Sequence, residues 1–288
     1  MIYTLKNENT ECKISSLGAE LTSLKDSSGL ERIWEGNPDF WAGQAPILFP
    51  IASRVYGDKY EYRGKLYEMK GHGFARRSEF ELISISKDSV TLRLLPSEIT
   101  RSAYPFEFEL ICEYRLTECG LSADFTVKNT GDEVMPYMFG WHPGFALTDG
   151  ECNEYSIAFK DGDSIRTYPG FDKNYTNEKT HPFPMENNIL PINDEQIGRV
   201  DTIILDGVSG YAKLSRNDGK YPIEFTFSDN LPVFCIWKVP KPTAKFICLE
   251  PWTDAPTGAK QTECFDTRKM SRLAPGESAV YSYNIGFC

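Results

Sequence analysis

Hydrophobic and polar residues alternate with a period of two along most of this chain, which is the pattern of half-buried β-strands. Residues 120–129 show it most clearly, and the turn-forming sequence Asn129-Thr130-Gly131 overlaps their end. The side predicted to face a core carries Leu121, Ala123, Phe125 and Val127. Residues 221–230 and 277–287 repeat the pattern, with the inward side chains Ile223, Phe225, Phe227, Ala279, Tyr281, Tyr283, Ile285 and Phe287. We also expect strands within residues 88–96, 106–116 and 244–252, and a hairpin that turns at Arg63-Gly64.

Helical patterns are scarce, with short candidates only after Asn37-Pro38 and around residues 97–103. Residues 161–196 are rich in Asn, Asp, Pro and Lys, and we expect long loops or lids over one end of the sheets there. Many short strands separated by turns predict an all-β fold of antiparallel sheet, either a sandwich or a barrel. Because no linker or fixed-period repeat interrupts the pattern, we expect a single domain over residues 1–288.

Composition and charge narrow the possible partners. The formal net charge is −10 and the isoelectric point is near 5.0, which argues against nucleic acid or an anionic membrane surface as the main partner. The first residues show no secretory signal, and no apolar run approaches the roughly 20 residues of a membrane-spanning helix. We therefore expect a soluble, cytoplasmic protein with a neutral small-molecule ligand.

The cysteine and histidine spacings give no local metal signature. Eight cysteines occur without a C-x-x-C pair, and the three histidines are far apart with no H-E-x-x-H motif. We expect reduced thiols, most of them acting as small buried hydrophobic residues.

The stretch MFGWHPGFAL, residues 138–147, places a histidine in an apolar run. Pro143 disfavours the helical region for His142, so the imidazole should project from extended backbone, as a working side chain would. An edge strand that enters a Pro-Gly turn, with His142 as an ordinary hydrogen-bonded residue, is the alternative.

His72 has the same kind of setting, with a glycine on each side. Glycine permits close backbone approach, so His72 should lie where another molecule or another strand comes near, although a simple glycine-rich turn is equally compatible. His181, the third histidine, lies in the polar region and has no such setting.

Glu250 ends the apolar run of residues 246–249. A carboxylate in apolar surroundings is either paired or functional, and burial would raise its pKa towards neutrality, which suits a general base. A salt bridge to an arginine at the end of the strand is the alternative.

Arg54 follows the aromatic and apolar residues 40–53. Its five donors suit hydroxyl and ring oxygens, whereas an ion pair with a buried acid such as Glu250 is the structural alternative. The five tryptophans could stack on sugar C–H groups, although core packing accounts for most tryptophans. No P-loop, dinucleotide-binding glycine motif or G-x-S-x-G elbow occurs, so phosphoryl transfer, hydride transfer and serine hydrolysis lack their usual signals.

Four stretches together resemble the aldose 1-epimerase (galactose mutarotase-like) family, and specifically its LacX-like branch. They are residues 37–54, 71–80, 140–145 and 248–252, and their order and rough spacing agree over nearly the whole chain. The resemblance implies a large twisted antiparallel β-sandwich with few short helices and an open cleft. It also implies no cofactor, and interconversion of the α and β anomers of a free sugar.

By this resemblance each candidate residue receives a role. Glu250 matches the general base that takes the proton of the anomeric hydroxyl, and His142 matches the general acid that protonates the ring oxygen. His72 and Arg54 match substrate-binding residues, and Asp201 is the candidate for an aspartate that binds sugar hydroxyls. The chemistry calls for an acid and a base on opposite sides of the substrate, with His142 partly protonated while Glu250 is ionised.

Other hypotheses about the function remain open from the sequence. A sugar-binding protein without turnover could share the fold, but binding alone needs neither an acid nor a base. A glycoside hydrolase normally needs two carboxylates, and only Glu250 stands out. Arg76 and Arg77 could serve a hexose 6-phosphate, whereas the net negative charge favours an uncharged sugar. The sequence does not indicate an oligomeric state.

Overall fold

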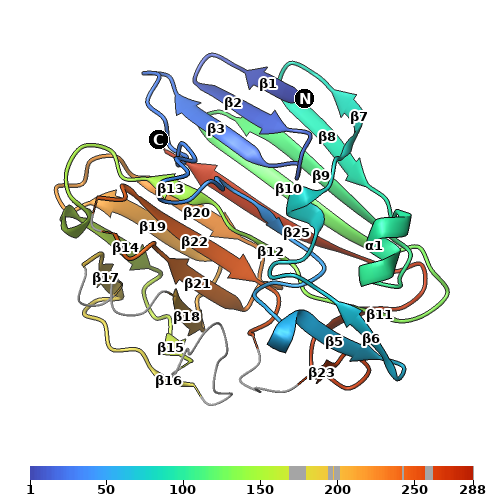
Figure 1. Cartoon of the computed structure of the whole chain (residues 1–288). Helices are drawn as coiled ribbons and strands as arrows, with labels where there is room; N and C mark the ends of the chain where they lie inside the picture. Colours follow the sequence, from blue (N-terminus) through green and yellow to red (C-terminus); the bar gives the residue numbers. More distant parts are fainter. Residues whose placement is uncertain (169–179, 194–196, 198–201, 242, 257–261, 288) are drawn as a thin grey trace.

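The computed structural model describes residues 1–168, 180–193, 197, 202–241, 243–256 and 262–287. Its largest sheet is antiparallel throughout and runs across the whole molecule (Figure 1). The strand order in this nine-stranded sheet is β17 (Ile189–Pro191), β14 (Tyr155–Phe159), β19 (Tyr211–Arg216), β20 (Ile223–Phe227), β25 (Ser278–Gly286), β10 (Gly120–Asn129), β9 (Phe108–Thr117), β8 (Ser89–Leu94) and β7 (Glu81–Ile85).

The second sheet has eight strands and is also antiparallel. Seven of its strands follow the order β16 (His181–Pro182), β15 (Arg166–Thr167), β18 (Thr202–Asp206), β21 (Val233–Trp237), β22 (Phe246–Trp252), β12 (Gly140–Trp141) and β4 (Ile47–Leu48). The eighth, β13 (Gly144–Ala146), also pairs with β22, at the opposite end of β22 from β12. Strand β22 is buried along its whole length, as expected for a central strand covered on both faces.

Three small sheets complete the described strands. They are β1 (Ile2–Lys6) with β2 (Thr10–Ser15) and β3 (Leu21–Asp26), β11 (Met135–Tyr137) with β24 (Ser271–Leu273), and β5 (Lys59–Tyr62) with β6 (Lys65–Glu68) and β23 (Glu263–Cys264). The α-helix α1 (Glu98–Ala103) begins at Ser97, whose hydroxyl accepts a hydrogen bond from the backbone N–H of Thr100 at 3.2 Å. Short 3₁₀ turns occupy Tyr56–Asp58, Ala75–Arg77 and Cys152–Glu154.

Aromatic side chains fill the space between the two large sheets. Trp141 of β12 is fully buried and lies 5.3 Å from Tyr283 of β25 and 5.6 Å from Phe125 of β10, measured between ring centroids. The Tyr283 hydroxyl donates to the carbonyl of Pro251 at 3.2 Å and ties β25 to β22. One face of the eight-stranded sheet therefore belongs to the core, which leaves its other face for a site.

The expected alternating strands are confirmed, and so is the hairpin at Arg63-Gly64, which joins β5 to β6. The helix expected at residues 97–103 is also confirmed, as α1. The helix expected after Asn37-Pro38 is wrong. Asn37 accepts only a single turn of hydrogen bonds, from the backbone N–H groups of Phe40 and Trp41, and the chain then turns away.

Within residues 161–196 we predicted only long loops, but the described part of this stretch also contains three short strands. The short strands β15, β16 and β17 pair at the outer edges of the two large sheets. Polar composition concealed them, because main-chain hydrogen bonds at a sheet edge need no apolar side chain. Residues 169–179 and 194–196 of this stretch lie outside the described part.

The expectation of reduced thiols is confirmed for most cysteines. Cys12, Cys112, Cys152, Cys235 and Cys248 are buried, and Cys264 is partly exposed. Cys119 is disulfide-bonded, so the expectation of reduced thiols is wrong at that residue. No helix in the described residues combines the length and the apolar character needed to span a membrane.

Candidate active site

Strand β22 presents Glu250 on the face of its sheet that points away from the core. Side chains alternate along a strand, so Leu249 packs in the main core while Cys248 and Glu250 share the opposite face. On the neighbouring strands Gly140 pairs with Trp252 and Gly144 with Cys248. The same register places His142 directly across from Glu250, and directly opposed side chains on adjacent strands lie on one face.

His142 and Glu250 are in direct contact. The Nε2 atom of His142 lies 3.2 Å from Oε1 of Glu250, and the two side chains are only 9% and 2% exposed. The other polar atoms of the pair, Nδ1 of His142 and Oε2 of Glu250, are buried without a hydrogen-bond partner among the described residues. Buried polar groups are normally hydrogen-bonded, so these two atoms are candidates for contact with a ligand.

Burial sets the protonation of this pair. It lowers the pKa of His142 to about 3 and raises the pKa of Glu250 well above its usual range, because the low-dielectric surroundings disfavour both charges. The indole N–H of Trp252 lies close enough to offset part of the Glu250 pKa shift, although its geometry falls short of a proper hydrogen bond. Both shifts favour the neutral forms, with the proton of the pair on the carboxyl group rather than on the imidazole.

The geometry bears on two expectations about the pair. Cross-strand pairing sets His142 and Glu250 side by side on one sheet face, and their placement on opposite sides of a sugar stays a prediction. Burial disfavours the charged forms of both residues, whereas a protonated His142 beside an ionised Glu250 is the state expected during turnover and stays a prediction.

Aromatic rings hold His142 in place. Trp41 stacks on its imidazole with ring centroids 5.0 Å apart, and Trp237 meets it edge-on at 5.7 Å. The carbonyl of Trp41 accepts a hydrogen bond from Nε1 of Trp34 at 2.7 Å, which anchors the loop that carries Trp41. A Cβ added at Gly144 would lie 2.8 Å from the Trp41 ring, so the glycine that follows Pro143 makes room for this stack.

His72 lies next to His142, with ring centroids 5.7 Å apart. Its φ of 62° is unusual for a residue with a side chain, and Ser53 fixes it through two hydrogen bonds. His72 N–H donates to the Ser53 carbonyl at 2.7 Å, and Ser53 N–H donates to Nδ1 of His72 at 3.1 Å. Because Nδ1 is an acceptor, the neutral ring carries its proton on Nε2. Gly73 follows with φ 68°, and a Cβ there would lie 2.1 Å from the Phe49 carbonyl oxygen.

Arg54 reaches the same part of the molecule. Its side chain passes over Gly71, where an added Cβ would lie 2.9 Å from Cγ of Arg54, and it is exposed. Its charge helps to lower the pKa of His72, whose main cause is burial. The structural alternatives for Arg54 and Glu250 do not occur: among the ion pairs of the described residues, Glu250 contacts only His142.

The structure therefore gathers Glu250, His142, His72 and Arg54 at one place. Asp201, the remaining predicted site residue, lies outside the described residues.

Two residues of this site were not identified from the sequence. Trp41 stacks on His142, and Cys248 brings its sulfur to within 4.8 Å of the ligand atoms of His142 and Glu250. Cys248 could have been predicted, because it precedes Glu250 by two positions in a predicted strand and so shares its face. Trp41 stood out only as one of five tryptophans that could stack on a sugar, and its contact with His142 arises from tertiary packing of its loop.

Two large antiparallel sheets packed face to face, with few helices, define the galactose mutarotase-like β-sandwich. The chain belongs to the aldose 1-epimerase family, because the sequence model of that family matches residues 1–284. Both findings confirm the resemblance noted in the sequence.

Individual relatives agree over the full length. The chain is 32% identical over 301 residues to the plasmid-encoded LacX protein of Lactococcus lactis subsp. lactis, covering 99% of each protein. A galactose mutarotase-like protein from Lactobacillus casei has a similar crystal structure, with a TM-score of 0.93, 28% identity and complete coverage of both chains. A galactose mutarotase related enzyme from Lactobacillus acidophilus gives a TM-score of 0.91 at 28% identity, covering 100% of this chain and 97% of that one.

Proposed function

We propose that this protein is an aldose 1-epimerase that interconverts the α and β anomers of a free hexose. The contact between His142 and Glu250 carries the proposal, because it joins an acid and a base that share one proton and have unsatisfied polar atoms. Membership of the aldose 1-epimerase family supports the same reaction.

Side-by-side placement suits the chemistry of a hemiacetal. The anomeric hydroxyl O1 and the ring oxygen O5 are bonded to the same carbon, so one proton must leave and another arrive at neighbouring atoms. In the forward step Glu250, as the carboxylate, takes the O1 proton while His142, as the imidazolium, donates to O5 and the C1–O5 bond breaks. Rotation about C1–C2 and reversal of both transfers yield the other anomer.

The proton on the pair reaches its working position by a short transfer. In the sugar-free protein it resides on Glu250, and the 3.2 Å contact allows it to pass to His142. Hydroxyl groups of the bound sugar would hydrogen-bond the carboxylate and so favour the charged arrangement. Both proton transfers then come from side chains, so the proposed reaction calls for no cofactor.

His72 and Arg54 are assigned to substrate binding. The Nε2–H of His72 is the free donor of that ring, because Nδ1 already accepts from Ser53, and it suits a sugar oxygen. The exposed guanidinium of Arg54 adds further donors close by. Asp201 remains the proposed acceptor for sugar hydroxyls.

A sugar-binding protein without turnover is the rival proposal. It accounts for the fold but leaves unexplained why an acid and a base are buried in contact, since desolvating both groups costs stability and binding needs neither. Polarimetry of freshly dissolved α-D-glucose and α-D-galactose, with and without the purified protein, tests the choice. Faster decay of the rotation with protein supports the epimerase, and spontaneous decay despite demonstrated sugar binding supports the rival.

A further inference from the structure

A thiol lies beside the acid–base pair, and the proposed mechanism does not use it. Cys248 is a fully buried free cysteine two residues before Glu250 on β22. Its Sγ and the ligand atoms of His142 and Glu250 all lie within 4.8 Å of one another. The three side chains thus supply sulfur, nitrogen and oxygen at a single point on one sheet face.

Part of this group lacks a partner. The Oε2 atom of Glu250 is buried and unpaired among the described residues, on a side chain that is 2% exposed, and Nδ1 of His142 is also unpaired. Ordinary packing would satisfy such atoms or exclude them. The carboxyl group of Glu250, which the indole N–H of Trp252 does not reach with hydrogen-bond geometry, lies next to a thiol and an imidazole, and a cation would complete this arrangement.

We propose that His142, Cys248 and Glu250 form a site for a thiophilic divalent cation, of which zinc is the best fit, and that its occupation blocks sugar turnover. The inhibition rests on the proposed epimerase function, whereas the binding of the metal does not.

The choice of zinc follows from the donor atoms and their spacing. Magnesium and calcium take oxygen ligands, whereas zinc accepts thiolate, imidazole and carboxylate together. Zinc bonds of about 2.0 to 2.3 Å in tetrahedral geometry place ligand atoms roughly 3.3 to 3.8 Å apart. The 3.2 Å between Nε2 of His142 and Oε1 of Glu250 falls just below this range, so a slight separation of the pair and a side-chain adjustment of Cys248 would complete the geometry. Three protein ligands leave a fourth position for water.

Inhibition follows because the cation would occupy the two groups that move protons. Coordination requires Cys248 as the thiolate and Glu250 as the carboxylate, so their protons pass to the solvent when the metal binds. A metal-bound Glu250 cannot take the O1 proton, and a metal-bound His142 Nε2 cannot donate to O5. Zinc and sugar therefore compete.

Zinc chloride is titrated into the full-length protein in a buffer free of thiols and chelators, and binding is measured by competition with a zinc-sensitive dye. We expect one zinc per chain and at least about a 10- to 100-fold weaker affinity in Cys248→Ala, since even altering the groups that support a ligand costs that much. Cys248→Ser serves as a second variant, and circular dichroism confirms folding of both. Cys235→Ala is the matched control, because Cys235 is a buried free thiol opposite Glu250 on β21 but outside the group of ligand atoms.

The binding and rate measurements separate the two proposals. Stoichiometric zinc that depends on Cys248, with a thiolate-to-metal charge-transfer band when cobalt replaces zinc, supports the site even if no mutarotation is detected. Mutarotation that zinc slows and EDTA restores supports the inhibition as well. Equal affinity in the wild type and in both Cys248 variants overturns the site, whatever the rate. Zinc bound through Cys248 without slowing an active enzyme overturns the inhibition.

Discussion

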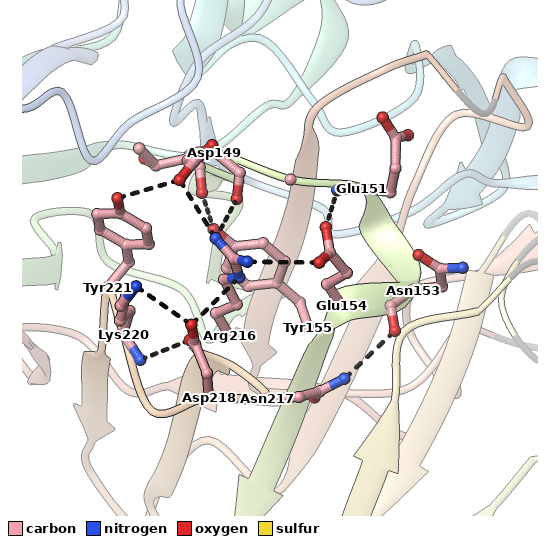
Figure 2. Close-up of polar contacts among 12 residues, drawn as sticks. Asp149, Glu151, Asn153, Glu154, Tyr155, Arg216, Asn217, Asp218, Lys220 and Tyr221 are labelled. Carbon is pink, nitrogen blue, oxygen red and sulfur yellow. Dashed lines mark hydrogen bonds and ion pairs between the residues drawn. The ribbon is translucent and has the colours of Figure 1, made fainter.

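Two polar clusters in this molecule differ in solvent exposure and in how completely their polar atoms are paired. Around Arg216, where β19 ends and β14 begins, every guanidinium nitrogen has a carboxylate: Asp149 at 3.2 Å, Glu154 at 3.4 Å and Asp218 at 3.6 Å (Figure 2). These three carboxylates are 41% to 69% exposed. The pair of His142 and Glu250 is almost fully buried and keeps one unpaired atom on each side chain.

This difference indicates which of the two clusters is functional. A paired, solvated network costs little to form and contributes little, typically below about 1 kcal/mol for each pair. An under-satisfied buried pair costs free energy of folding, and proteins carry such costs mainly where chemistry or binding needs them. Changes at the buried pair should therefore affect turnover, and changes at Arg216 should not.

His142→Asn should give the largest effect. Asparagine is polar but shorter than histidine at the Nε2 position and cannot exchange a proton, so turnover should fall by about 10²- to 10⁴-fold, the usual share of one general acid. Polarimetric rates at saturating sugar measure the loss, and an unchanged circular dichroism spectrum shows that the fold survives. A rate within a few-fold of wild type would remove His142 from the mechanism.

Gly144→Ala should disturb the pair indirectly. The added methyl group would lie 2.8 Å from the Trp41 ring, so the ring that stacks on His142 must shift. Displacing a catalytic group by about 1 Å can cost up to about 10²-fold, which sets the expected size of the rate loss. Gly286→Ala controls for glycine substitution as such, because φ there is ordinary and an added Cβ would meet only the Glu224 carbonyl oxygen, at 3.9 Å. Equal rates in the two variants would show that the Trp41 stack does not position His142.

The rate of turnover should not fall with protonation of His142 near the ordinary pKa of histidine. The active pair holds one proton: it gains a second only as the pH falls towards the His142 pKa of about 3, and loses the first only above the raised pKa of Glu250. We therefore expect kcat/KM not to fall as the pH is lowered through the ordinary histidine pKa of about 6.5. A profile measured by polarimetry that falls on the acid side of that value would mean that His142 titrates as an exposed imidazole.

Arg216→Gln should give the smallest effect. Its ion pairs are solvated, so the free energy of unfolding should drop by no more than about 1 kcal/mol, and the polarimetric rate should stay at the wild-type value. Urea denaturation gives the stability. A large loss of turnover would mean that the Arg216 network acts on the site.

Much of the fold could be predicted from the sequence, because the hydrophobic pattern of each strand is local. Alternation in residues 120–129 and a continuous apolar run before Glu250 each specify a strand and the direction of its side chains. Edge strands such as β16 were missed because a histidine and a proline, held only by main-chain bonds, leave no hydrophobic pattern.

The site was readable only in part. His142, His72 and Glu250 stand out as polar residues in apolar or glycine-rich stretches. Their contacts depend on strand register and on loop packing, neither of which is encoded locally. The neutral state of the pair also follows from burial, which only the assembled sheets reveal.

The central claim is that the pair of His142 and Glu250 interconverts anomers, and Glu250→Gln tests it most directly. Two-dimensional exchange NMR on an equilibrated hexose reports anomer interconversion, and broadening of the sugar signals reports binding in the same sample. We predict exchange cross-peaks between the α and β anomers with the wild type, and with Glu250→Gln broadened sugar signals without protein-dependent cross-peaks. Cross-peaks of equal strength with both proteins would contradict the account.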